Sequence, residues 1–211
     1  MTKVKVKKSN SKIVLVLDYG VPEDDQHAGG LSSTQYMKMF IDIGYEVIFY
    51  PMNPKIVEPY STRLTEYGID LIDRNKYIDL ESFLGQNKLT IDFVWINRPD
   101  VAKNFINLIK EFITAKIFYI PHDIAYKRLE RQSMFEEVNP ELIKEKKEEE
   151  QKIMDSVDFI LFFTNDDLEI SKKEFNLSES KLRIIPAYFY DQIKNDYSNK
   201  IQRKNILFVG N

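Results

Sequence analysis

The chain has 211 residues, of which 43% are hydrophobic and 30% are charged, and its formal net charge is -3. That length allows one large α/β domain with a true core or at most two small domains, and the nearly balanced charge gives no general case for nucleic acid as a partner. Cysteine is absent, which excludes disulfides, thiol nucleophiles and cysteine-ligated zinc.

The first twelve residues, "MTKVKVKKSNSK" (1–12), are basic and lead into the first apolar run. They contain no signal-type apolar segment with a small-residue cleavage site, and the longest apolar runs of the chain have the length of a strand. We therefore expect a flexible, solvated N-terminus and a cytoplasmic location. The lysines could still make a peripheral contact with the anionic inner face of a membrane.

Apolar segments of two kinds alternate along the rest of the chain. The run "KIVLVLD" (12–18) is continuous and β-branched, as in a strand that is buried on both faces. The segment "LSSTQYMKMFIDIG" (31–44) has helical spacing and ends on Gly44, a typical C-terminal stop. The alternation continues with a strand at 45–51, helix 60–68, strand 69–73, helix 79–87, strand 91–97, helix 99–113, strand 115–121, a helix opening near 127, helix 139–157, strand 158–164, helix 165–175 and strand 181–186.

This order of elements predicts the fold class. Strands that alternate with helices through short connections form a mostly parallel sheet with helices on both faces, so we expect a Rossmann-like α/β domain over residues 13–190. The polar stretch "DQIKNDYSNKIQRK" (191–204) is typical of a linker. The chain ends on "NILFVGN" (205–211), which we interpret as the first strand of another α/β unit.

One predicted helix is unusually polar. The nine residues "KEKKEEEQK" (144–152), in the middle of the helix at 139–157, include no apolar side chain. We expect this helix to be exposed through its middle as a solvated face.

The predicted sheet also indicates where a site should lie. In an open parallel sheet, ligands bind beyond the carboxyl ends of the strands. Three polar loops fall there, at 18–34 after the first strand, 97–100 after the fourth and 121–128 after the fifth.

Two glycines end the first of these loops. Gly29 and Gly30 precede a helix, so the backbone could approach a ligand closely and present N–H groups at the positive end of the helix dipole. They could equally ease a long loop into the helix. A dinucleotide fingerprint is not present, since "GxGxxG" is missing. The acids Asp24 and Asp25 in the same loop fit solvated side chains better than a metal site.

The third loop carries a histidine. His122 lies at the end of a strand, beside Asp123, where imidazole could hydrogen-bond a substrate hydroxyl or relay a proton. It could instead simply cap a turn.

Arginines stand near the same strand ends. Arg98, Arg128 and Arg131 could clamp a phosphate or a carboxylate. The last two could equally pair with Glu130 and Glu136. From the residues alone, we therefore expect a polyhydroxylated or anionic ligand in a cleft, with its chemistry undetermined.

The order of segments resembles a known family. The segments that carry the resemblance are "DYGVPEDDQHAGG", "EPYSTRLTEYGIDLID", "DFVWINRPDVA", "YIPHDIAYKRLERQ", "VDFILFFTNDD", "LRIIPAYF" and "ILFVGN". Together they look like the amino-terminal half of a GT-B glycosyltransferase, closest to the bacterial enzymes of glycosyltransferase family 4. Such enzymes have two Rossmann-like domains, of which the first mainly receives the acceptor and the second binds the nucleotide-sugar donor.

The resemblance implies roles for particular residues. Gly29 and Gly30 correspond to the loop that approaches the donor diphosphate, and His122 falls where many relatives carry a histidine close to the transferred sugar. Arg98 matches an arginine-proline pair after the fourth strand. His27 departs from the family pattern, because an acidic residue is expected there.

The expected function follows from this resemblance. It implies the acceptor-binding domain of a nucleotide-sugar-dependent glycosyltransferase in bacterial cell-surface polysaccharide or glycoconjugate assembly, inactive without its second half and without a metal or cofactor. Its partners would be a sugar, glycolipid or glycan acceptor and the nucleotide sugar. We take Gly29, Gly30, Arg98, Asp123 and Arg128 as candidate binding residues and His122 as the candidate catalytic residue. A β-branched residue at position 30 should then impair activity more than folding.

The alternative is a flavodoxin-like signalling or ligand-binding module without enzymatic activity. A phosphoreceiver of that type needs an aspartate at the end of the third strand, for which Asp73 is available, and a lysine after the fifth. The fifth strand ends in "YIPHD" without a lysine, which disfavours this reading. A nicotinamide-dependent dehydrogenase is disfavoured by the missing glycine fingerprint.

Overall fold

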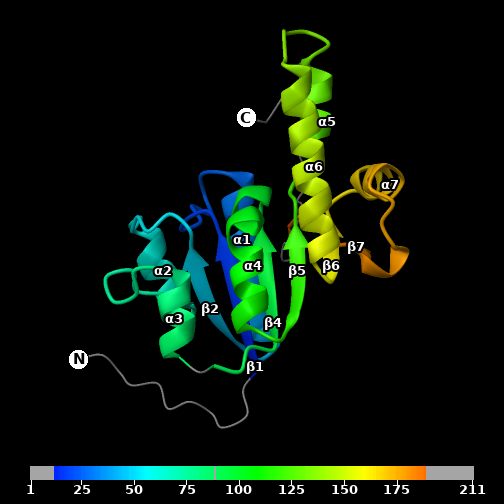
Figure 1. The fold of residues 1–211 in the computed structure, drawn as a ribbon. Helices are drawn as coiled ribbons and strands as arrows, with labels where there is room; N and C mark the ends of the chain where they lie inside the picture. Colours follow the sequence, from blue (N-terminus) through cyan, green and yellow to red (C-terminus); the bar gives the residue numbers. More distant parts are fainter. Residues whose placement is uncertain (1–11, 88, 189–211) are drawn as a thin grey trace, which may run out of the picture.

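The computed structural model describes residues 12–87 and 89–188 (Figure 1). The strands are β1 (Lys12–Asp18), β2 (Tyr45–Pro51), β3 (Asp70–Leu71), β4 (Phe93–Asn97), β5 (Lys116–Ile120), β6 (Phe159–Phe162) and β7 (Leu182–Ile184). The helices are α1 (Ala28–Asp42), α2 (Tyr60–Glu66), α3 (Leu80–Gln86), α4 (Pro99–Phe112), α5 (Ala125–Gln132), α6 (Pro140–Ser156) and α7 (Asn165–Glu174), with a short 3-10 turn, η1 (Glu179–Lys181). The predicted N-terminal tail up to residue 11, the linker at 191–204 and the strand at 205–211 lie outside the described residues.

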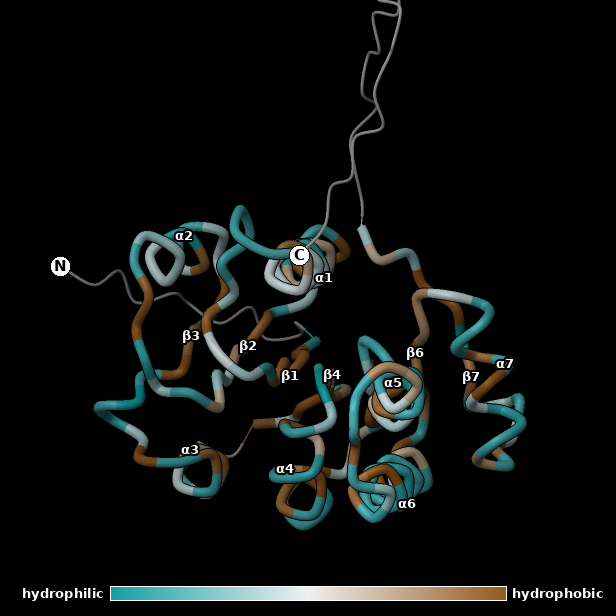
Figure 2. Tube along the Cα trace, turned by 90° about the horizontal axis from the view of Figure 1, so that it is seen from above, coloured by the Kyte–Doolittle hydropathy of each residue, from teal (hydrophilic) through white to brown (hydrophobic). Residues whose placement is uncertain are grey.

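The strands form one seven-stranded sheet in the order β3-β2-β1-β4-β5-β6-β7, and every neighbouring pair is parallel. Seen along the strands in Figure 2, α1 and α2 cover one face, whereas α3, α4 and α6 cover the other. The strand order reverses direction between β1 and β4, as in a Rossmann sheet. The predicted fold class is therefore confirmed, and the sheet is wholly rather than mostly parallel.

The central strand explains why the core has two halves. Successive side chains of a strand point to opposite faces. Accordingly, Val14 and Val16 of β1 pack with α1 and α2, whereas Leu15 and Leu17 pack with α3 and α4. All four are at most 1% exposed, so β1 is buried on both faces as its continuous apolar run predicts.

The ends of α1 are set by local chemistry. The helix begins at Ala28, three residues before the predicted start, because the His27 side chain caps it by accepting the Gly30 N–H. It ends just before Gly44, whose φ of 93° is a left-handed conformation that favours glycine. The predicted stop is confirmed.

The expectation that the middle of α6 is solvated is wrong at one position. Glu150 is only 1% exposed. Its carboxylate accepts the backbone N–H groups of Ala125 at 2.7 Å and Tyr126 at 3.2 Å, which belong to the first turn of α5. A negative charge at the positive end of α5 is favourable, so a residue that looks like surface polarity in the sequence serves as a cap for another helix.

The helices α5 and α6 form a hairpin that extends past the carboxyl ends of the strands (Figure 1). Its base is held by ion pairs between Lys103 and Glu149 at 2.5 Å and between Lys147 and Glu174 at 2.6 Å. Within the residues that the structure describes, no helix has the length and apolar character needed to cross a bilayer.

Candidate functional site

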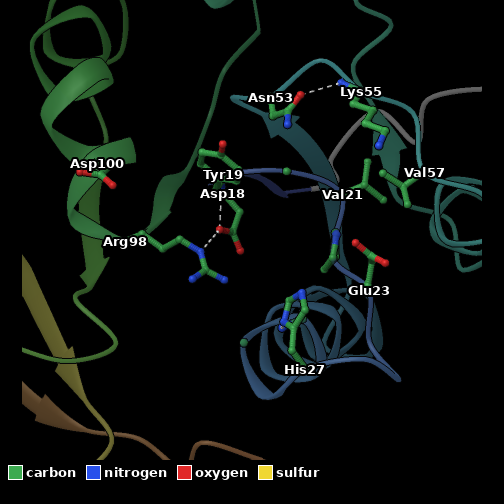
Figure 3. Close-up of a pocket in the computed structure, with 14 residues that line it drawn as sticks. Asp18, Tyr19, Val21, Glu23, His27, Asn53, Lys55, Val57, Arg98 and Asp100 are labelled. Atoms are coloured by element: carbon green, nitrogen blue, oxygen red, sulfur yellow. Dashed lines mark hydrogen bonds and ion pairs between the residues drawn. The ribbon is translucent and has the colours of Figure 1, made fainter. Parts of the chain in front are cut away.

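A pocket lies at the carboxyl edge of the sheet, where the strand order reverses between β1 and β4. Its volume is about 640 Å³, which suits a small ligand. Three loops line it, those after β1, β2 and β4 (Figure 3). The lining residues are Asp18, Tyr19, Gly20, Val21, Pro22, Glu23, His27, Gly29, Gly30, Asn53, Lys55, Val57, Arg98 and Asp100.

A buried carboxylate forms the floor of the pocket. Asp18, the last residue of β1, is 2% exposed. Its Oδ1 accepts the Tyr19 N–H at 2.7 Å and the Nε–H of Arg98 at 2.7 Å, and its Oδ2 accepts from the amide of Asn97 at 3.2 Å. Three donors, one of them cationic, offset the cost of burying this charge.

The arginine that Asp18 holds points into the pocket. Arg98 uses only Nε for the carboxylate, and no acceptor among the described residues contacts its two terminal nitrogens. Its backbone N–H donates to the Ile120 carbonyl at 2.9 Å, and its φ of 73° is left-handed. This strained backbone turns the side chain toward Asp18 instead of along α4 (Figure 3), which leaves a guanidinium fork available to a ligand.

Gly29 lets Arg98 lie over the start of α1. A Cβ at position 29 would stand 2.8 Å from Arg98 Nη2, so the guanidinium covers the first turn of the helix. A cation against the positive end of a helix dipole is unfavourable unless an anion offsets it, and Asp18 supplies one charge beside them. The arrangement therefore leaves room and donors for a second anionic group.

Gly30 packs closely against the loop that follows β1. A Cβ there would come within 2.5 Å of the Glu23 carbonyl oxygen and 2.9 Å of the His27 ring. The missing side chain thus makes room for the chain's own loop, and Gly30 also lines the pocket. Because that clash is with backbone, a β-branched residue at position 30 should impair folding as well, which weakens the expectation that activity would suffer more than folding.

His122 lies near Arg98 but outside the residues that line the pocket. Its φ is 70°, its Nε2 is buried without a partner in the described part of the chain, and its ring meets the edge of Phe163 at a centroid distance of 5.5 Å. Burial, followed by the positive charge of Arg98, lowers the pKa of His122 to about 4, while Asp18 and Asp123 oppose that shift. At neutral pH the ring is uncharged, and its buried Nε2 has the capacity for one further hydrogen bond.

Asp123 and Arg128 are paired with each other. Arg128 Nη1 contacts the Asp123 carboxylate, and both side chains are about half exposed or more. Neither lines the pocket, and Arg131 is exposed farther along α5. The structure thus brings Gly29, Gly30 and Arg98 into one pocket. His122 interacts with Arg98 but, like Asp123 and Arg128, does not line that pocket. The alternative pairing of Arg128 with Glu130 is not observed, since Lys127 takes that partner at 2.8 Å.

Two acidic residues in the loop after β1 contact helix α2. Arg63 of α2 lies 3.2 Å from Asp24 and 3.3 Å from Asp25, and the Tyr60 hydroxyl donates to Asp25 at 2.5 Å. These contacts tie the loop to α2. Across residues 12–87 and 89–188, no group of three or more His, Cys, Asp or Glu side chains is arranged to hold a metal ion.

Sequence reasoning missed two parts of the site. It did not single out Asp18, although a carboxylate that directly follows a buried apolar strand is a signal of the kind used for His122. It also passed over the loop after β2, which supplies Asn53, Lys55 and Val57 to the pocket. The polar "MNPK" (52–55) after that strand was the available clue.

No model of a protein family matches the chain, and a search of curated proteins finds no match. The fold and the geometry of the pocket are therefore the basis for any proposal about function.

Proposed function

We propose that this chain is the acceptor-side half of a nucleotide-sugar-dependent glycosyltransferase of GT-B type, in bacterial cell-surface polysaccharide or glycoconjugate assembly. One observation carries the proposal. The unengaged guanidinium fork of Arg98 lies over Gly29 at the start of α1 and faces a pocket at the reversal point of a Rossmann-like sheet. Donors that converge on one pocket wall suit an oxygen-rich ligand with an anionic group, as in the substrates of such enzymes.

Each residue then has a role. Gly29 allows the guanidinium of Arg98 to lie against the helix start, and Arg98 binds a phosphate or carboxylate oxygen of the substrate. His122 is uncharged at neutral pH because its pKa is lowered to about 4, and it would bond a hydroxyl of the transferred sugar only once ligand binding uncovers its buried Nε2. The second half of the cleft would come from a further Rossmann-like domain that binds most of the donor.

The strand order argues against the alternative of a flavodoxin-like module. That type of sheet has the order 2-1-3-4-5. The order here is β3-β2-β1-β4-β5-β6-β7, which differs from the strand order of a flavodoxin-like sheet.

The test is release of nucleotide from a panel of nucleotide sugars with and without sugar acceptors. We expect no turnover by residues 1–211 alone, because transfer requires donor and acceptor to be positioned together. The full product of the gene should turn over at least one donor, and Arg98→Lys should lower its kcat/KM at least about tenfold by removing a two-pronged contact. Arg183→Lys, on the outer strand β7, is the matched control and should leave the rate unchanged. Turnover by residues 1–211 alone, or a full product that handles no nucleotide sugar, would contradict the proposal.

A further inference from the structure

The wall of the pocket that faces Arg98 is a fixed surface built from two loops. The Met52 N–H donates to the Asp18 carbonyl at 2.9 Å, and the Asn53 N–H donates to the Tyr19 carbonyl at 2.6 Å. These bonds continue the pairing of β1 with β2 beyond the ends of both strands. The side chains that follow are therefore held at a defined place relative to β1.

This wall presents hydrogen-bond donors and one aromatic ring. Asn53 Oδ1 accepts the Lys55 backbone N–H at 3.1 Å, which orients the side chain and leaves the amide Nδ2 as a donor for a ligand. Lys55 lines the pocket, and no carboxylate in the described part of the chain forms an ion pair with it. The Tyr19 side chain, 52% exposed at the rim, offers an apolar face to a sugar ring.

The opposite side of the pocket also presents mainly donors. The two terminal nitrogens of Arg98 are unengaged, and Arg98 and Lys55 enter from opposite sides in Figure 3. His27 Nδ1 accepts the Gly30 N–H at 2.9 Å, so Nε2 is the ring nitrogen left to face a ligand. The remaining acceptors are the carboxylates of Glu23 and Asp100, because Asp18 is already engaged by three donors.

We propose that this pocket binds a sugar that carries an anionic group, a phosphate or a carboxylate, between Lys55 and Arg98. Two cationic side chains on facing walls match one anion, whereas Glu23 and Asn53 match the hydroxyls of an attached ring. A volume of about 640 Å³ accommodates a mono- or disaccharide. That this sugar is the acceptor of a transfer reaction rests on the proposed function, but its binding does not.

The test is a titration of the isotopically labelled chain, followed through the amide resonances of Gly29, Gly30 and Lys55. The probes are glucose 1-phosphate, glucuronate, glucose, inorganic phosphate and UDP. We expect one of the two anionic sugars to bind at least about tenfold more tightly than glucose or inorganic phosphate, since a charge-assisted hydrogen bond is worth about that factor. The better of the two tells whether the anion is a phosphate or a carboxylate.

A pair of lysine variants isolates the charge. Lys55→Met should weaken the anionic sugar about tenfold and leave glucose unchanged, because only the ammonium is lost. Lys110→Met, the same substitution on the exposed last turn of α4, should change neither. Both lysines are exposed, so both variants should fold.

Several results would overturn the assignment. Equal affinities for glucose and the anionic sugars, or an unchanged affinity in Lys55→Met, would show that the pocket does not recognise an anionic group. If inorganic phosphate bound as tightly as the sugar phosphate, the pocket would not recognise the sugar ring. If UDP bound and the sugar phosphate did not, the pocket would be a nucleotide site. The two proposals remain separable: transfer activity without anionic-sugar binding would overturn this inference alone, and binding without any transfer would overturn the proposed function alone.

Discussion

The Nε of Arg98 lies 2.7 Å from Oδ1 of Asp18, and this ion pair joins a buried carboxylate to a side chain that is one-third exposed. The pair spans the point where the sheet reverses, because Asp18 ends β1 and Arg98 follows β4. It fixes the direction of the only guanidinium that lines the pocket within the described residues.

Removing Asp18 should destabilise the fold. Asp18→Ala leaves the Nε of Arg98, the amide of Asn97 and the Tyr19 N–H without their acceptor, so we expect the free energy of unfolding to fall by about 2–4 kcal/mol. Asp18→Asn keeps the shape and one acceptor oxygen and should lose less. Urea unfolding of the two variants measures the difference. Equal losses would mean that the hydrogen bonds of the carboxylate contribute little.

Neighbouring glycines should respond differently to alanine. At position 30 the new Cβ meets the backbone of Glu23 at 2.5 Å, so Gly30→Ala should lower the free energy of unfolding by about 1–3 kcal/mol. At position 29 the new Cβ meets only side-chain atoms, the guanidinium of Arg98. Gly29→Ala should therefore leave stability within about 0.5 kcal/mol, since alanine also favours the helix, while the displaced guanidinium weakens sugar-phosphate binding.

Unfolding of the two glycine variants under the same conditions, with a glucose 1-phosphate titration of Gly29→Ala, checks both halves of this expectation. If Gly29→Ala proved the less stable protein, or bound glucose 1-phosphate as well as the unmodified chain, the placement of Arg98 over Gly29 would be wrong.

His122 should make the protein less stable in mild acid. Its folded pKa of about 4 is below the ordinary value near 6.5, so between those values the unfolded chain binds the proton more tightly than the folded one. Stability is therefore fully present above pH 6.5 and is lost as the pH falls toward 4, by about 2–3 kcal/mol for this group. His122→Asn, which tolerates a left-handed φ, should flatten the dependence.

Chemical unfolding at pH 7, 6, 5 and 4.5 measures this slope. The control is His27→Asn, which removes the only other histidine and keeps a capping side chain. A slope that is unchanged in His122→Asn would show that other groups cause the acid sensitivity.

Glu150 should contribute to the stability of the fold although it lies in a run of charged residues. Glu150→Ala removes the acceptor of two N–H groups at the start of α5, so we expect a loss of about 2 kcal/mol in the free energy of unfolding. Glu150→Gln keeps one acceptor and should lose less than half as much. Glu148→Gln, on the exposed side of the same helix, should be neutral. Unfolding of the three variants in guanidinium chloride measures these differences in stability.

Glu150 should also affect how the stability of the protein depends on pH. Burial raises the pKa of Glu150, against the hydrogen bonds from Ala125 and Tyr126, so the folded protein holds this proton more tightly than the unfolded chain. Its contribution to stability therefore falls as the pH rises through the raised pKa. Glu150→Gln should remove that part of the pH dependence, and an unchanged profile would contradict the burial of this carboxylate.

The sequence was sufficient for the fold because hydrophobic periodicity is a local property. Runs such as 12–18 and helical stripes such as 99–113 identify strands and helices, and short parallel connections leave few topologies. Every described strand and helix lies within a few residues of its predicted place. The same logic placed Gly29, Arg98 and His122 at one edge of the sheet, since parallel strands end together.

Contacts between distant residues could not be read in this way. Glu150 and Ala125 are 25 positions apart, and Asp18 and Arg98 are 80 apart. No local pattern tells whether a polar side chain ends in solvent or against another helix. The sequence by itself determined where a site could be, through the order of its strands. Only the tertiary structure decided which side chains meet there, because burial and hydrogen-bond geometry depend on residues that are far apart in the chain.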